Sequence, residues 1–189
     1  MFDELNRAID EYQNKWNALV AQRKNKEFFE RLKPTTVGWK VADLAEYDRL
    51  KNEWRGACDL VFEKWMNERW IAEIHLKDTK LSGGIEVIKL MQRRPNSSDA
   101  LGLDNMDFMD MEETNTKAVL SEEGDLKYTD EANGLCAWIS IWFDGTEAKL
   151  RQGTPLDVAI DELREVNSKI RGKFIPSHEA NAAAVAEVE

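Results

Sequence analysis

The sequence predicts an α+β protein in which two βαβββ modules follow one another, with a helix before the first module and another after the second. Three observations support this prediction. The order strand, helix, strand, strand, strand occurs twice, and each occurrence spans about fifty residues. Strong hairpin turns, Asn133-Gly134 and Asp144-Gly145, separate strands of the second series. Helical spacing of apolar residues also occurs outside both series, toward the two ends of the chain.

The N-terminal helical segment covers residues 1–33, with a helix predicted over residues 2–32. Its apolar side chains recur at alternating spacings of three and four, and this seam consists of Phe2, Leu5, Ile9, Tyr12, Trp16 and Leu19. The seam fails at Arg23 and Lys26, which argues against a long coiled coil. Two interpretations stay open: the helix packs on its own domain, or the seam forms a homodimer contact.

The first module covers residues 34–95. Alternation predicts a short strand over residues 37–42, and Asp43 with Glu46 forms a capping box at the start of a helix over residues 43–60. Short segments rich in β-forming residues follow it. They predict strands over residues 61–65, 69–76 and 85–92, with turns at residues 66–68 and 81–84.

The second module covers residues 101–152 and repeats this order. The predicted elements are a strand over 103–109, a helix over 114–123, and strands over 126–129, 137–143 and 146–151. The two modules are expected to form one compact domain. A closing helix is predicted over residues 155–172, with Pro155 in its first turn and Gly172 at its end. Its apolar face would consist of Leu156, Ala159, Leu163, Val166 and Ile170, and residues 173–189 are predicted to be a flexible tail.

Composition restricts the class of protein and its partners. The net charge of −10 argues against a general nucleic-acid binder, because a phosphate backbone would be repelled, but it leaves room for a local basic pocket. No apolar window is long enough to span a bilayer, so no membrane partner is expected. The first residues lack a basic stretch followed by an apolar one, which predicts no secretory signal and a cytoplasmic location. Cys58 and Cys136 are isolated, and are expected to be free thiols of the core.

Four stretches in order carry a resemblance to a known family: "EFFERLKPTTVGWKV", "YDRLKNEW" with "WMNERWIAEIHL", "GLDNMDF" and "WFDGTEAKLR". Over residues 25–165 the chain resembles the vicinal oxygen chelate superfamily of glyoxalases, bleomycin-resistance proteins and extradiol dioxygenases. Within it, the chain looks most like the YecM-like branch. The resemblance implies curved mixed sheets around a cup that takes a small molecule, with His and Glu from the strands holding a metal where one is present.

The chain departs from the metal-binding pattern of that family. In "GLDNMDF", Asn105 stands where the resemblance implies a histidine, and a carboxamide oxygen is a poor ligand for zinc, nickel or iron. We therefore expect no cofactor and a metal site that has lost its function. The alternative is a weakly bound divalent metal held by His75 and Glu147.

The candidate ligand-binding residues are His75, Asn105, Asp107, Glu147, Arg151, Trp138 and Trp142. Alternation puts His75 on one face of its strand with Glu73, where it is either a general base or a partly exposed histidine near a strand end. Asn105 and Asp107 share a face, while Asp104 lies on the other. Arg93, Arg94 and Arg151 end strands, where they either bind a small anion or pair with the surplus acids.

Three functions stay open on the sequence alone. The first is a small-molecule-binding YecM-like protein with a degenerate metal site, to which no reaction and no catalytic residue is assigned. The second is a divalent-metal-dependent enzyme of the glyoxalase or dioxygenase type. The third is a non-catalytic acidic protein-interaction module that uses the N-terminal seam.

Overall fold

The structure is a computed structural model, and it describes residues 1–78, 80–109, 113–133, 136–160 and 162. The helices that precede the closing helix in the described residues are α1 (Asp3–Val20), α2 (Lys26–Arg31), α3 (Leu44–Trp54) and α4 (Glu113–Glu122). The strands are β1 (Pro34–Val41), β2 (Cys58–Met66), β3 (Arg69–Leu76), β4 (Val87–Gln92), β5 (Gly102–Phe108), β6 (Lys127–Asn133), β7 (Cys136–Phe143) and β8 (Thr146–Arg151). Short 3₁₀ turns occur at Arg55–Ala57 and Ser82–Gly84.

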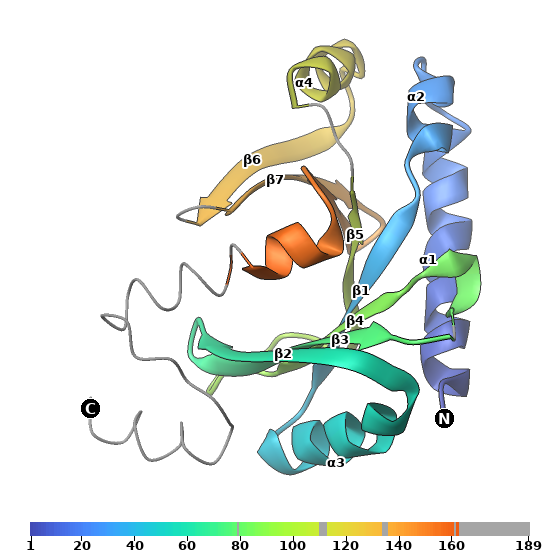
Figure 1. Ribbon diagram of the computed structural model, residues 1–189. Helices are drawn as coiled ribbons and strands as arrows, with labels where there is room; N and C mark the ends of the chain where they lie inside the picture. The colour runs from blue at the N-terminus through green and yellow to red at the C-terminus, as the bar shows by residue number, and fades with distance from the viewer. Residues whose placement is uncertain (79, 110–112, 134–135, 161, 163–189) are drawn as a thin grey trace.

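The eight strands form one sheet in the order β2-β3-β4-β1-β5-β8-β7-β6. Each half follows the same plan, because β1 runs parallel to β4 in the first module and β5 runs parallel to β8 in the second. The modules meet where β1 pairs antiparallel with β5. The sheet curves, with α1 along its convex side and the opening of the cup on the other side (Figure 1). The predicted fold class is confirmed.

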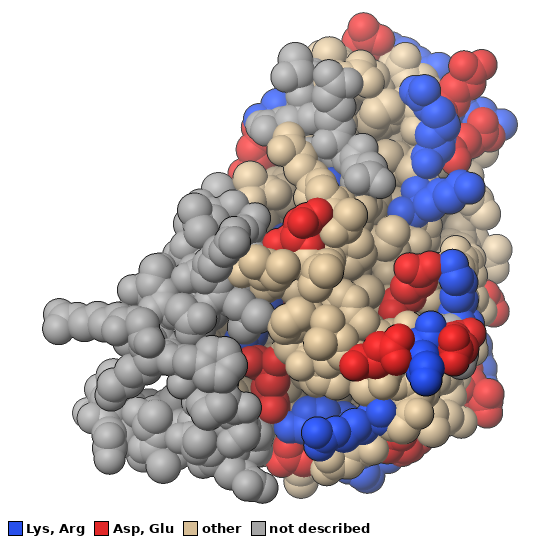
Figure 2. Space-filling model, in the orientation of Figure 1, with Lys and Arg blue, Asp and Glu red and all other residues tan. Residues whose placement is uncertain are grey.

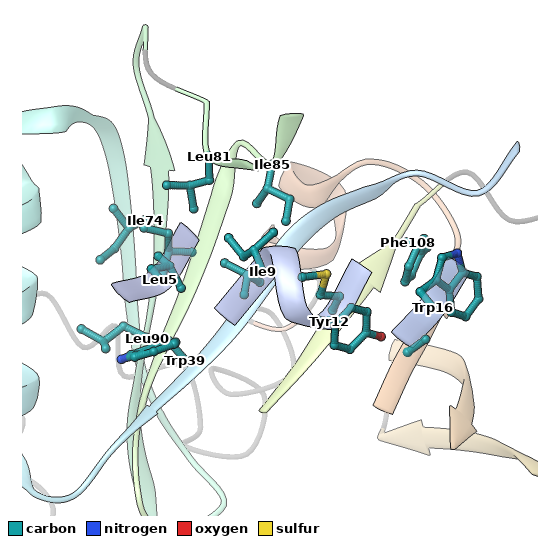
Figure 3. Packing of buried hydrophobic residues seen from close by; sticks show 14 of the residues in the cluster. Leu5, Ile9, Tyr12, Trp16, Trp39, Ile74, Leu81, Ile85, Leu90 and Phe108 are labelled. Carbon is teal, nitrogen blue, oxygen red and sulfur yellow. The ribbon is translucent and has the colours of Figure 1, made fainter. Parts of the chain in front are cut away.

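Helix α1 forms the core with the convex face of the sheet. Leu5, Ile9 and Tyr12 are all nearly inaccessible to solvent, and Figure 3 shows these side chains directed at apolar residues of the strands. Phe2 and Trp16 of the seam are buried as well, and Leu19 packs against the same core. The interpretation that this helix packs on its own domain is confirmed, so the seam is not an open surface for a partner.

The prediction of one continuous helix over residues 2–32 is wrong, because the chain turns between α1 and α2. The carboxylate of Glu123, in the second module, accepts hydrogen bonds from the backbone N–H groups of Lys24 at 3.2 Å and Asn25 at 2.7 Å. Backbone donors held by a side chain are not available for the i to i−4 bonds of a continuing helix. The turn therefore ties the N-terminal segment to the second module.

The start of α3 is capped by side-chain hydrogen bonds, as the sequence predicts for this helix. Asp43 Oδ1 accepts from the Glu46 backbone N–H at 2.9 Å, and Glu46 Oε2 accepts from the Ala42 backbone N–H at 3.0 Å. The N-cap at Asp43 is confirmed, while Glu46 reaches back to Ala42 rather than to the N-cap residue itself. The helix nevertheless ends at Trp54 rather than near residue 60, because a 3₁₀ turn leads directly into β2. Cys58 at the start of β2 is a free, half-buried thiol; the side chain of Cys136 lies outside the described residues.

The described part of the closing helix comprises residues 155–160 and 162. Ala159 is fully buried, as predicted, but Leu156 is 43% exposed, so its place on the apolar face is wrong. Leu163, Val166, Ile170, Gly172 and the predicted tail lie outside the described residues. The helix lies within the opening of the cup, on the side of the sheet away from α1 (Figure 1).

Two observations concern the surface and the membrane. On the face shown in Figure 2, basic and acidic side chains are intermingled rather than gathered into separate patches. Within the described ranges, no helix combines the length and the apolar character that crossing a bilayer requires.

Candidate functional site

Alternation along β5 separates polar from apolar side chains. Phe108 packs against Trp16 of α1, with ring centroids 4.7 Å apart, so it lies on the convex face. Asn105 and Asp107, at the alternate positions, therefore point into the cup. They also touch one another there, because the Asn105 amide donates to the Asp107 carboxylate. The predicted shared face of these two residues is confirmed.

Six charged side chains are buried together on this concave face, and we call them the cup cluster. Its members are Lys64 of β2, Glu73 of β3, Lys89 of β4, Asp107 of β5, Arg151 of β8 and Glu162 of the closing helix. Lys64 Nζ donates to Glu73 Oε1 at 2.7 Å, and Lys89 Nζ lies 2.9 Å from both carboxylate oxygens of Glu162. Lys64 Nζ also contacts Glu162 Oε2. Both modules and the closing helix thus contribute to one polar centre.

Arg151 connects the two halves of the cup cluster. Its Nε lies 2.7 Å from Asp107 Oδ2, and its Nη1 lies 3.5 Å from Glu162 Oε1. Its guanidinium group stacks over the Trp138 ring, 4.9 Å from the ring centroid. A planar cation held between carboxylates and an aromatic face is more restricted than a lysine would be.

The charges within the cup cluster balance, since three cations face three carboxylates. Burial alone would raise the pKa of Glu162, but the positive charges of Lys89, Lys64 and Arg151 outweigh it and hold the pKa well below its ordinary value. Burial alone would lower the pKa of Lys89, yet Glu162 and Glu73 outweigh burial and raise it. Lys89 and Glu162 are therefore both ionised at neutral pH.

A second polar chain continues from the cup cluster along the strands of the second module. Asn105 lies opposite Glu147 in the register of β5 and β8. Ser140 Oγ donates to Glu147 Oε1 at 2.5 Å, and Trp138 Nε1 donates to Ser140 Oγ at 3.0 Å. The structure therefore brings together five of the predicted site residues, namely Asn105, Asp107, Glu147, Arg151 and Trp138.

The other two predicted residues are less closely connected. His75 shares the concave face with Glu73, but its ring packs edge-on against Phe62, with centroids 5.6 Å apart. Burial lowers the pKa of His75, only partly offset by the charge of Glu73, so the ring is neutral at pH 7. Its Nε2 is buried and finds no hydrogen-bond partner among the described residues. Trp142 is 47% exposed.

Of the three arginines that end strands, Arg94 and Arg151 form the ion pairs that the second alternative predicted. Arg94 lies 3.6 Å from Asp99, and Arg151 pairs with Asp107. Lys40 joins this outer group, because its Nζ lies 3.1 Å from Asp99 Oδ2 and 2.6 Å from Asp104 Oδ1.

The donor set does not fit a resident metal. Within the described ranges, no three His, Cys, Asp or Glu side chains lie close enough to bind one ion. His75 and Glu147, the ligands of the metal alternative, lie on β3 and β8, and three strands separate them in the sheet. The carboxylates nearest Asn105 and Arg151 are already engaged by cations or hydroxyl groups.

Sequence reasoning missed Lys64, Lys89 and Glu162 as site residues. A signal existed for Lys89, because it is the one charged residue in the strand "VIKLMQ", whose other residues are apolar apart from the last. Glu73 in "RWIAEIHL" shows the same pattern. Such a residue in a strand buried on both faces requires a partner inside the protein. Glu162 carried no such signal, since its helix is rich in charges.

Comparisons with known proteins rest on structure, because no protein-family model matches the chain and no curated protein matches its sequence. A structural-genomics protein named EC4020 is similar, with a TM-score of 0.60 and 13% identity over 85% of this chain and 93% of that chain. A methylmalonyl-CoA epimerase is similar with a TM-score of 0.50 and 14% identity, over 65% of this chain and 96% of that chain. At these identities the likeness concerns the fold alone, and the architecture of the chain is consistent with a glyoxalase-like fold.

Proposed function

We propose that this chain binds a small organic molecule in its cup, at the cup cluster and the adjoining Trp138. The observation that carries the proposal is the burial of six charged side chains on one face of the sheet. Buried ion clusters contribute little to stability compared with a well-packed apolar core. Their concentration in a concave site, where the pKa of Glu162 is lowered and that of Lys89 is raised, is typical of functional sites.

The predicted residues have distinct roles in this proposal. Arg151 binds a polar group of the ligand, and Trp138 presents its ring as an apolar wall. Asn105, Asp107 and Glu147 orient the cations and offer hydrogen-bond acceptors. His75 and Trp142 line the approach to the cup.

We further propose that the site works without a resident metal and descends from one that held it. Asn105 occupies the cup-facing position on β5 that the family resemblance assigns to a histidine, and it lies opposite Glu147. The proposal keeps the YecM-like branch as the nearest relatives and the cytoplasm as the location. The proposal assigns no reaction to the site.

The protein-interaction alternative has less support. It depended on the N-terminal seam, whose side chains are buried against the sheet of the same chain. Self-association remains to be tested by the sedimentation of the full chain, but the seam does not supply its interface.

The proposal is tested by titrating the full chain with a set of metabolites and following tryptophan fluorescence and the melting temperature. A saturable response to at least one compound is expected in the wild type. Lys89→Gln should weaken that response by about tenfold or more, whereas the exposed control Lys80→Gln should leave it unchanged. A flat response to the whole set, or equal effects of the two variants, contradicts the proposal.

A further inference from the structure

The closing helix places a carboxylate where a ligand of the cup would bind. Glu162 is only 5% exposed, and its helix follows both modules in the sequence. Its two carboxylate oxygens lie within 3.5 Å of Lys89 and Arg151, and it also contacts Lys64. These cations come from β4, β8 and β2. One carboxylate therefore contacts cations from both halves of the sheet.

This arrangement has the chemistry of a carboxylate receptor. Two ammonium groups and one guanidinium group converge on the two oxygens, and charge-assisted hydrogen bonds of this kind are the strongest that proteins make to carboxylates. Ala159, one turn earlier, is fully buried, so the helix is seated in the cup by an apolar contact as well. Figure 1 shows the helix inside the opening rather than along an outer edge.

Removing Glu162 from the cup would leave unequal charges behind. Glu73 would remain 2.7 Å from Lys64, and Asp107 would remain 2.7 Å from Arg151. Lys89 would keep only the longer contact of 3.5 Å to Glu73 among its ion pairs. The emptied position would carry three cations and two carboxylates, and a second anion would restore the balance.

We propose that Glu162 is an internal ligand, which occupies the position of a carboxylate group of the small molecule and must leave when that molecule binds. This inference rests on the proposed function and narrows it to carboxylate-bearing ligands. Because Glu162 is tethered to the chain, it competes at a high effective concentration. Only the fraction of molecules with an undocked helix binds, so the apparent affinity for a free carboxylate is reduced by that fraction.

The first experiment compares wild type with Glu162→Gln in titrations with sodium acetate and sodium succinate, against sodium chloride at equal ionic strength. Tryptophan fluorescence and the melting temperature report binding. The half-saturating concentration of succinate should fall by about tenfold or more in Glu162→Gln. The control Glu53→Gln removes an exposed carboxylate on α3 that pairs with Arg49, and it should behave as wild type.

A second experiment needs no variant, so it stands even if Glu162→Gln folds poorly. Hydrogen exchange of backbone amides is measured in the wild type with and without saturating succinate. Displacement of Glu162 should speed exchange in residues 156–160 while slowing it in β2 and β4, which would hold the ligand. Unchanged or slower exchange in the helix at saturation overturns the inference.

The outcomes separate this inference from the proposed function. Equal half-saturation by succinate in wild type and Glu162→Gln overturns the internal ligand but leaves the cup as a binding site. The absence of any saturable response to acetate and succinate in both proteins overturns the internal ligand. The proposed function is overturned only if the metabolite set also gives a flat response.

Discussion

At the scale of single residues, the charges inside the cup determine both stability and pH response. Lys89 is the clearest case, because it lies between Glu73 and Glu162 on a strand that is otherwise packed in the core. Removing one partner of a buried ion cluster leaves the other charges uncompensated in a medium of low dielectric constant. Removing any one member should therefore lower the free energy of unfolding more than removing an ion pair at the surface.

We expect Lys89→Met to lower the free energy of unfolding by roughly 3–5 kcal/mol, since Glu162 loses one of the two lysines that contact it. The double variant Lys89→Met/Glu162→Gln should recover part of this loss, because it removes the stranded charge as well. Urea denaturation measures both. The exposed control Lys80→Met should change stability by about 0.5 kcal/mol or less. A double variant that is less stable than Lys89→Met would contradict the coupling.

The pH dependence of stability follows from the depressed pKa of Glu162. Burial alone would raise this pKa, but Lys89, Lys64 and Arg151 hold it well below its ordinary value of 4.5. A carboxyl group of this kind stabilises the fold above its unfolded pKa and loses that contribution as pH falls through its folded pKa. Between about pH 5 and pH 2, the wild type should therefore lose more unfolding free energy than Glu162→Gln. Urea denaturation across this range measures the difference, and parallel curves would contradict it.

The sequence was informative about these residues only where strand alternation operates. It put Asn105 and Asp107 on one face because a strand has a period of two, and their contact confirms it. It did not connect Lys64 with Glu162, since 98 residues separate them and no local pattern encodes their meeting. Long-range pairs of charges depend on how the sheet curves, which is a property of the folded chain.

At the scale of elements, hydrophobic periodicity was the most informative signal. The strands Arg69–Leu76 and Thr146–Arg151 have the bounds that were predicted for them. The N-terminal helix was predicted by its seam, but its break was not, because the cause is the distant carboxylate of Glu123. Helical propensity describes a segment alone, whereas tertiary contacts determine where the helix ends.

Helix α1 should be required for the folded core. Ile9 is fully buried at its centre, and Figure 3 shows it between Leu5 and Tyr12 against the strands. Ile9→Ala should lower the free energy of unfolding by roughly 2–5 kcal/mol, because it leaves a cavity between helix and sheet. Chemical denaturation measures the loss, and sedimentation should show an unchanged oligomeric state. A change in oligomeric state with little loss of stability would instead indicate that the seam is an interface.

At the scale of the whole molecule, the pairing of β1 with β5 makes one cup from two modules. The order of elements in the sequence was sufficient to predict two βαβββ units, because each unit is local. How the units join, and what fills the cup between them, could not be predicted. Those features depend on Gly38, where β1 pairs with β5, and on a helix that follows both modules. Neither has a distinctive local pattern.

Gly38 lies where the two modules meet beside the site, opposite Asn105 across the β1–β5 pair. A Cβ atom at Gly38 would lie 2.5 Å from Asn105 Oδ1 and 3.1 Å from Met91 Cε. Asn105 is buried and hydrogen-bonded to Asp107, so it can move aside only by disturbing the polar centre. The absence of a side chain at Gly38 thus lets β1 and β5 pair beside a buried carboxamide.

Gly38→Ala should therefore lower the free energy of unfolding by roughly 1–3 kcal/mol, the range typical of overpacking in a tight core. Gly56→Ala is the matched control, because a Cβ there meets no atom within 4 Å and the backbone has no positive φ. That control should be neutral or slightly stabilising, since alanine restricts the unfolded chain. Urea denaturation of both variants measures the free energy of unfolding. Equal stabilities would mean that the junction of β1 and β5 has room for a methyl group, and that the position of Asn105 does not depend on Gly38.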